Sequence, residues 1–209
     1  MFFEDRKQAG EILAERLAKY KNKKDALVLA IPRGGVETGY YLAKNLWLKL
    51  DIVITKKIGA PYNQELAVGA VGPDKTVYLN QDVIDLYGIP ENYIKKEIEN
   101  IGKLVREKYK FFRGSKKPPA IKNKTIILTD DGIATGATIL AAAHYIKNQR
   151  PGKLVIAVPV CPEDTLLELK KIADEVICLS TNLIMGAVGA CYKNFPQVTD
   201  TQVKDYLKS

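Results

Sequence analysis

Apolar runs and amphipathic segments alternate along the chain. Short runs rich in β-branched residues are typical of buried strands, and apolar residues recurring three or four positions apart are typical of helices packed by one face. The runs predict strands at 26–31, 51–55, 68–71, 76–79, 125–129, 154–158 and 175–179. The helical spacing predicts helices at 5–20, from the turn after 31 through 46, at 82–112, from 139 onward and at 163–172.

This alternation predicts an α/β fold with a doubly wound, mainly parallel sheet flanked by helices. No internal repeat or linker divides the sequence, so we expect one domain over residues 1–209, with 81–113 as a helical insertion. The segment 57–66 carries Gly59, Pro61 and Asn63 and is predicted to form a loop. Ligands of such sheets gather at the carboxyl ends of the strands, so the chemistry is expected there.

The composition predicts a globular cytoplasmic protein. The 209 residues are 46% hydrophobic, which is enough for a substantial core. No apolar run is long enough to span a membrane, and the acidic Glu4 and Asp5 argue against a signal peptide. Cys161, Cys178 and Cys191 are widely spaced, which favours a reducing compartment over a zinc site or a disulfide framework.

The net charge of +8 favours anionic partners, either nucleic acid or phosphorylated small molecules. Much of the positive charge lies in residues 94–117, where Ile94, Ile98, Ile101 and Val105 follow helical spacing. This segment is therefore predicted to be an amphipathic helix with a solvated basic face. The same face is the candidate surface if nucleic acid is the partner.

The segment 125–138, with the sequence TIILTDDGIATGAT, carries the most specific signal in the chain. An apolar strand ends in Asp130 and Asp131, and a loop of small residues leads into a helix. Backbone N–H groups at a helix N-terminus bind anions, and Thr135 and Thr138 can add hydroxyl donors. The carboxylates would repel a phosphate but can hold hydroxyls or a metal ion beside it. A phosphorylated sugar has both kinds of group.

This segment resembles the motif with which type I phosphoribosyltransferases bind 5-phosphoribosyl 1-pyrophosphate (PRPP). The resemblance implies the fold of that family, with 81–113 contributing to a small hood. It implies that Asp130 and Asp131 hold the ribose hydroxyls and, through these hydroxyls or water, Mg²⁺ as cofactor. The loop would bind the rest of the sugar phosphate through Gly132, Ala134, Thr135, Gly136, Ala137 and Thr138.

Two further basic segments fit the same resemblance. Pro32-Arg33-Gly34-Gly35 follows the first strand, where the family has its pyrophosphate loop, and a non-proline cis peptide is implied there. Gly34 and Gly35 let the backbone approach a ligand, and Arg33 can donate two hydrogen bonds to phosphate oxygens. Lys56 and Lys57 are predicted to end the second strand and to meet the same anion; Lys57 and Arg33 are assigned catalytic roles.

Residues 58–67 stand where the family has a mobile catalytic loop. Such a loop can close over the bound substrate and exclude water, which protects the cationic centre that forms as pyrophosphate leaves. Glu65 is the only acid in this segment and is the candidate to act on a nitrogen of the acceptor.

The segment 186–195 resembles the base-binding tail of the hypoxanthine-guanine branch, and Val188, Tyr192 and Phe195 are assigned to the acceptor. Two residues depart from that branch: Lys193 replaces an acid, and Ala134 replaces the aspartate that acts on the purine. The whole chain is most similar to a group of bacterial and archaeal predicted phosphoribosyltransferases, for which the acceptor is not known to us.

The sequence thus predicts a phosphoribosyltransferase that uses PRPP and Mg²⁺ to attach phosphoribose to a nitrogen acceptor, with a nucleobase as the leading candidate, and releases pyrophosphate. The resemblance also implies a homodimer. The alternative is a PRPP-sensing regulator that binds nucleic acid, although no helix-turn-helix or RNA-recognition motif supports it. A hydrolase of phosphorylated sugars would need a water-activating residue, and none stands out in the sequence.

Overall fold

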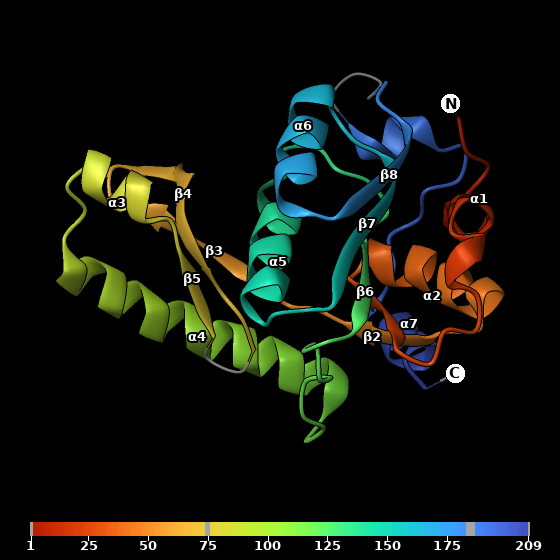
Figure 1. The fold of residues 1–209 in the computed structure, drawn as a ribbon, viewed down its shortest axis with the longest axis horizontal. Coiled ribbons are helices and arrows are strands. Elements are labelled where there is room, and N and C mark those ends of the chain that lie inside the picture. Colours follow the sequence, from red (N-terminus) through yellow and green to blue (C-terminus); the bar gives the residue numbers. More distant parts are fainter. Residues whose placement is uncertain (1, 74–75, 183–186, 209) are drawn as a thin grey trace.

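A five-stranded sheet forms the centre of the computed structural model, which describes residues 2–73, 76–182 and 187–208 (Figure 1). All five strands are parallel, in the order β2-β1-β6-β7-β8. Strands β1 and β6 are buried along their whole length, as expected for a parallel sheet covered on both faces. The bounds are β1 Ala26–Ala30, β2 Lys49–Ile52, β6 Thr125–Thr129, β7 Lys153–Val160 and β8 Glu175–Ser180.

Helices cover both faces of this sheet (Figure 1). Successive residues of a strand point to opposite faces, so Val28 and Ile127 pack against α1 and α2, whereas Leu128 and Ile156 pack against α5 and α6. The sheet is therefore doubly wound, which confirms the predicted fold class. The helices on the two faces are α1 Arg6–Arg16, α2 Gly34–Leu46, α5 Ala137–Asn148 and α6 Glu163–Ile172.

A second sheet, antiparallel and in the order β3-β4-β5, lies beside the first and is accompanied by α3 and α4 (Figure 1). Ile58, Val68, Val105 and Phe112 belong to the apolar core that joins α4 to this sheet. The C-terminal α7 contributes Val203 to the same core. The elements are β3 Lys56–Ala60, β4 Asn63–Val71, β5 Val77–Leu79, α3 Gln81–Leu86, α4 Glu91–Arg113, α7 Asp200–Tyr206 and the 3-10 turns η1 Ala18–Tyr20 and η3 Val188–Cys191.

The segment predicted to be a loop at 57–66 is instead a β-hairpin made of β3 and the start of β4. Gly59, Pro61 and Asn63 suggested a loop, but in this sheet Gly59 allows close backbone contact, as does Gly69 further along β4. A Cβ atom on Gly59 would lie 2.8 Å from the Gln64 carbonyl oxygen, and one on Gly69 would lie 2.2 Å from that of Tyr78. Strand pairing therefore overrides the local glycine signal.

Other elements also differ from the prediction. The second strand spans Lys49–Ile52 rather than 51–55, so Lys56 and Lys57 do not end it but begin β3. The helical region is divided into α3 and α4 around Gly88, whose φ of +57° suits glycine, and Pro90, which precedes α4. Helix α7 was not predicted; its capping box at Thr199 was present in the sequence.

Two observations bear on the expected compartment. Within the described ranges, no helix is both long and apolar enough to cross a membrane. Cys161, Cys178 and Cys191 are free thiols, and Cys161 and Cys191 are buried.

Helices α1 and α2 pack closely because Gly10 presents no side chain at their contact. A Cβ atom at this position would lie 2.5 Å from the Thr38 carbonyl oxygen and 3.0 Å from the Cβ of Tyr41. The contact places the start of α1, and with it Arg6, beside the carboxyl edge of the sheet.

We expect Gly10→Ala to lower the free energy of unfolding by about 1–3 kcal/mol, because the added methyl group overlaps backbone of α2. Gly102→Ala in α4 is the matched control, since its Cβ would meet the flexible end of Arg106 at 3.0 Å and a methyl group of Val71 at an ordinary contact distance of 3.8 Å. That control should be neutral or stabilising by up to about 1 kcal/mol from helix propensity. Urea unfolding measures both changes, and equal effects would contradict the packing argument.

Candidate functional site

The loops after β1 and β6 meet at the carboxyl edge of the core sheet. The two motifs identified in the sequence are in contact there: a Cβ atom on Gly34 would lie 1.8 Å from Asp131 Oδ2, and one on Gly35 would lie 2.6 Å from Asp130 Oδ1. Any larger residue would displace a carboxylate or the loop. The peptide bond between Pro32 and Arg33 is cis, as the resemblance implied.

The loop after Asp131 forms an open cradle at the N-terminus of α5. The Ile133 N–H donates to the Val160 carbonyl oxygen at 2.8 Å, which fixes the loop to the end of β7. Gly136 has a φ of +79° and is the N-cap of α5, so the first N–H groups of this helix point into the loop. Thr135 and Thr138 are exposed. Exposed hydroxyls beside free helix amides suit a phosphate group.

The two carboxylates have different surroundings. The Asp131 N–H donates to Asp130 Oδ1 at 2.9 Å. Burial raises the pKa of the Asp130 carboxyl well above its ordinary value, and the negative charge of Asp131 raises this pKa further. Asp130 is therefore costly to ionise in the free protein, and it would gain from a ligand that donates hydrogen bonds to it.

Asp131 is paired with Arg6, a residue that the sequence analysis missed. Arg6 Nε donates to Asp131 Oδ2 at 2.8 Å, and Arg6 Nη1 donates to the Pro196 carbonyl oxygen at 2.7 Å. Its guanidinium lies 3.7 Å from the ring centroid of Phe195. Arg6 is only 4% exposed, so the pair is held in a region of low solvent access. A signal existed: Arg6 lies on the apolar face of α1, three residues before the buried Ala9.

The three tail residues assigned to the acceptor lie beside the carboxylates. A Cβ atom on Gly132 would lie 2.4 Å from a methyl group of Val188. The Tyr192 hydroxyl donates to the Asp131 carbonyl oxygen at 2.5 Å, and its ring stacks on that of Phe195 with centroids 4.8 Å apart. Tyr192 is buried and Phe195 is half-buried, so both rings also serve as packing around Arg6.

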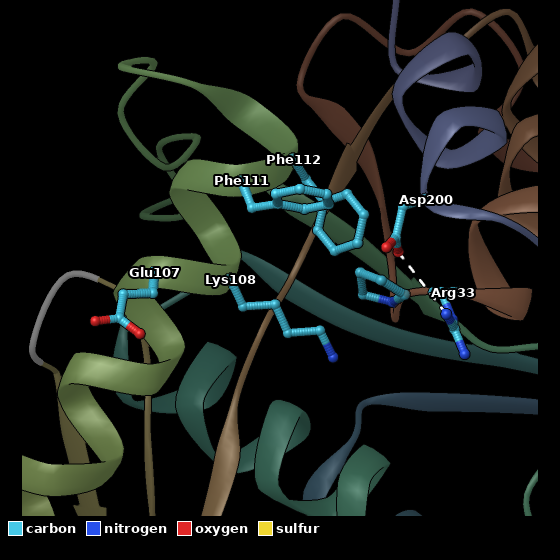
Figure 2. Close-up of a pocket in the computed structure, with 7 residues that line it drawn as sticks. Arg33, Glu107, Lys108, Phe111, Phe112 and Asp200 are labelled. Carbon is cyan, nitrogen blue, oxygen red and sulfur yellow. Dashed lines mark ion pairs between the residues drawn. The ribbon is translucent and has the colours of Figure 1, made fainter.

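Arg33 points into a pocket between α4, α7 and the loop after β1 (Figure 2). Its Nη1 lies 3.9 Å from Asp200 Oδ1 at the start of α7. The pocket has a volume of about 730 Å³, and Lys108 is its second cation. The residues that line it are Pro32, Arg33, Glu107, Lys108, Phe111, Phe112 and Asp200. Arg33 directly precedes the glycines that contact Asp130 and Asp131, although neither these glycines nor the aspartates line the pocket.

A family model described as the phosphoribosyl transferase domain matches residues 4–194 of this chain. The chain belongs to the phosphoribosyl transferase family. Among similar proteins are two from Mycobacterium tuberculosis strains CDC 1551 and H37Rv, named "Putative phosphoribosyl transferase" MT0597 and Rv0571c. Each is 39% identical to this chain over 210 residues, which covers 98% of this chain and 46% of the relative. The chain thus spans about half the length of these relatives.

The fold is also similar to a solved structure. The crystal structure of TT1426 from Thermus thermophilus has a TM-score of 0.91 to this chain and is 36% identical in sequence. The similarity covers 99% of this chain and 98% of that protein. The fold described above, including the second sheet and α4, therefore has a counterpart of known structure.

Some residues predicted to belong to the site of this phosphoribosyl transferase domain lie in the second sheet and not in the loops that meet at the carboxylates. Lys56 and Lys57 belong to β3 of the second sheet, where they pair with Val71 and Ala70. Both lysines nevertheless lie shortly after the core sheet in the chain. The last contact with that sheet is made by Val53, whose N–H donates to the Ala30 carbonyl oxygen at 3.1 Å. The side chain of Glu65 lies outside the described residues, so its role stays a prediction.

We expect Asp130→Asn to stabilise the free protein at neutral pH while removing a ligand-binding charge. Because folding raises the pKa of Asp130, ionisation of this carboxyl destabilises the fold, and the neutral amide escapes this cost. The advantage of the variant should be full above the raised pKa and should vanish below the ordinary pKa of about 4, where Asp130 is protonated in both states.

Unfolding by urea at several pH values, with EDTA present, measures this difference. Asp85→Asn on the exposed surface of α3 controls for the loss of a carboxylate. An Asp130→Asn variant that is less stable than the wild type across the whole pH range would contradict the burial argument.

Proposed function

We propose that this protein is a phosphoribosyltransferase that transfers phosphoribose from PRPP to a nitrogen acceptor and releases pyrophosphate. One observation carries the proposal: a carboxylate pair, an open anion cradle and a glycine loop converge at one edge of the sheet. A sugar with a 5-phosphate, two free hydroxyls and a diphosphate has a group for each of these three features. Membership of the phosphoribosyl transferase family supports the same assignment.

In this proposal the carboxylates bind the sugar and the cradle binds its phosphate. The ribose hydroxyls donate to Asp130 and Asp131, and these hydrogen bonds compensate the cost of ionising Asp130. The 5-phosphate lies in the loop and accepts from its amides and hydroxyls. The phosphate contacts come from Gly132, Ala134, Thr135, Gly136, Ala137 and Thr138.

The leaving pyrophosphate is assigned to the loop after β1. Gly34 and Gly35, which follow this loop as the first residues of α2, lie against the carboxylates and therefore close to the proposed position of the sugar. Arg33, exchanging Asp200 for the leaving group, would stabilise the negative charge that develops as the C1–O bond breaks. Lys56 and Lys57 at the start of β3 are the other cations proposed to act on pyrophosphate.

The chemistry is displacement at the anomeric carbon. The nitrogen of the acceptor forms the new bond to C1 as the bond to pyrophosphate breaks, and the electron pair leaves with pyrophosphate. The proton of the acceptor nitrogen is lost in the reaction, and Glu65 is the proposed group to receive it. The β3–β4 hairpin, with Glu65 in β4, is proposed to cover the site and exclude water, which would otherwise capture the cationic sugar. Most of the rate gain would come from positioning the two reactants.

Mg²⁺ fits this site only with the help of the substrate. Among the described side chains, no three carboxylate, histidine or cysteine groups converge as a metal-binding cluster. Asp130 and Asp131 supply hard oxygen donors, and the remaining ligands would be substrate oxygens and water, as is usual for Mg²⁺. When bound, the ion would offset the charge of the diphosphate.

The acceptor is proposed to be a nucleobase held near Val188, Tyr192 and Phe195. The stacked rings beside Asp131 are the observation that favours a flat acceptor. The helices α3 and α4, which span the predicted insertion at 81–113, are proposed to act as the hood. A cytoplasmic homodimer remains the proposed form of the protein.

The first test is incubation with PRPP, Mg²⁺ and a panel of nucleobases, with pyrophosphate release and nucleotide formation followed by mass. Release with one base would establish both the reaction and the acceptor. Binding of PRPP by calorimetry without turnover would favour the PRPP-sensing regulator. The double variant Asp130→Asn and Asp131→Asn should lose PRPP binding and keep its circular dichroism spectrum; unchanged affinity would contradict the proposed site.

We expect Arg33→Ala to reduce kcat by roughly 100-fold or more, with a much smaller loss of affinity for PRPP, because the negative charge that Arg33 would stabilise develops on the leaving group as the C1–O bond breaks. Steady-state kinetics and calorimetry separate the two quantities. Arg16→Ala, at an exposed position in the last turn of α1, is the matched control. If turnover and PRPP affinity fall by the same factor, the proposed role of Arg33 is wrong.

A further inference from the structure

Trp47, the only tryptophan of the chain, is exposed on the surface at the end of α2. It is 69% exposed and stands at the C-cap of the helix in the left-handed conformation, with a φ of +55°. The backbone therefore turns out of the helix at this residue. A large, exposed aromatic side chain at a fixed position is a suitable platform for another flat group.

Two shallow grooves meet at Trp47. The first has a volume of about 500 Å³, and its cations are Lys7, Lys21 and Lys44. Lys21 Nζ lies 5.0 Å from the centroid of the Trp47 ring, and Lys7 Nζ lies 5.8 Å from that of Tyr41. Glu11 is the acidic residue that lines this groove.

The second groove has a volume of about 370 Å³ and also has Trp47 in its wall. Its cations are Lys23, Lys24, Lys49 and Lys124. Asn22, Ala26, Leu27 and Leu48 complete it, so the described lining includes no acid. Trp47 thus stands between two lysine-lined grooves.

The second groove lies at the opposite edge of the sheet from the candidate active site. Lys24 precedes β1, Lys49 begins β2 and Lys124 precedes β6, and these three strands are parallel. Their amino ends therefore gather here, whereas Asp130 and Asp131 follow the carboxyl end of β6. The surface and the active site can be occupied at the same time.

The charge on this surface identifies the kind of partner. A second copy of the chain docking by the same surface would bring lysines against lysines, so the charge disfavours self-association here. A polyanion would be attracted, and an anionic chain with flat groups would use both the lysines and the ring. The other basic element, α4, offers a less favourable surface. Its Lys95 is paired with Glu91 at 2.7 Å, and the exposed Glu107 places a negative charge among its lysines.

We propose that Trp47 and the two lysine-lined grooves form a binding site for single-stranded nucleic acid. One base stacks on the indole, and the backbone runs from one groove to the other with its phosphates against the lysines. This assignment does not depend on the proposed transferase reaction, since it uses none of the residues at the carboxyl edge.

The intrinsic fluorescence of Trp47 gives a direct test, because no other tryptophan contributes. An oligothymidylate or oligouridylate of about 15 nucleotides should quench the emission at low salt, since stacking places a base on the indole. The association constant should fall as salt rises, with a logarithmic slope of about −0.7 for each phosphate neutralised.

Variants locate the site by the anisotropy of a labelled oligonucleotide. Trp47→Ala should weaken binding roughly tenfold or more through the lost stacking. The double charge reversals Lys21→Glu with Lys44→Glu, and Lys24→Glu with Lys49→Glu, should each weaken it at least as much. Lys96→Glu with Lys103→Glu on the exposed face of α4 makes the same change of net charge and should have little effect. Circular dichroism confirms that each variant is folded.

Three outcomes would overturn the proposal. The first is the absence of quenching and of anisotropy change at low salt. The second is an equal loss of binding in the α4 variant, which would show attraction by net charge alone. The third is a blue-shifted emission with phosphatidylserine vesicles and no response to oligonucleotide, which would assign the surface to anionic membranes.

Discussion

The contact between the glycine loop after β1 and the carboxylates after β6 determines the geometry of the carboxyl edge. Two adjacent aspartates at the end of a buried strand repel each other and lose solvation, so they need close and specific neighbours. Gly34 and Gly35 allow the β1 loop to lie directly on these side chains, where any Cβ atom would overlap them. The parallel pairing of β1 with β6 holds the two loops in this register.

Arg6 connects the two ends of the chain to this contact. It lies on the first helix, pairs with Asp131, and donates to the carbonyl of Pro196 in the C-terminal tail. The Phe195 ring covers its guanidinium and limits the access of water. The two carboxylates therefore differ before any ligand arrives: Asp131 is paired with a buried cation, whereas burial raises the pKa of Asp130.

The positive charge of the protein is divided between the two edges of the core sheet. At the carboxyl edge, Arg33 and Lys108 line a pocket beside the loop that contacts the carboxylates. At the amino edge, lysines from several segments flank an exposed tryptophan. Parallel strands make this separation possible, because their starts and ends lie at opposite edges of the same sheet.

The sequence by itself determined the fold class and identified the two motifs that meet at the carboxyl edge. The alternation of apolar runs and helical segments, and the order Asp130-Asp131 before a loop of small residues, are local patterns that need no distant contact to be recognised. Sequence alone failed where distant contacts outweigh local signals. Gly59 is typical of a loop but stands in a β-hairpin, because strand pairing brings backbone against it.

Only the tertiary structure placed Arg6 on Asp131, since the two are 125 residues apart and the pair forms through the packing of α1 on α2. It alone also gathered Lys24, Lys49 and Lys124 around Trp47, because parallel pairing, not sequence spacing, brings the amino ends of β1, β2 and β6 together. Local pattern therefore specified most elements of the core sheet, and long-range packing decided which charges became neighbours.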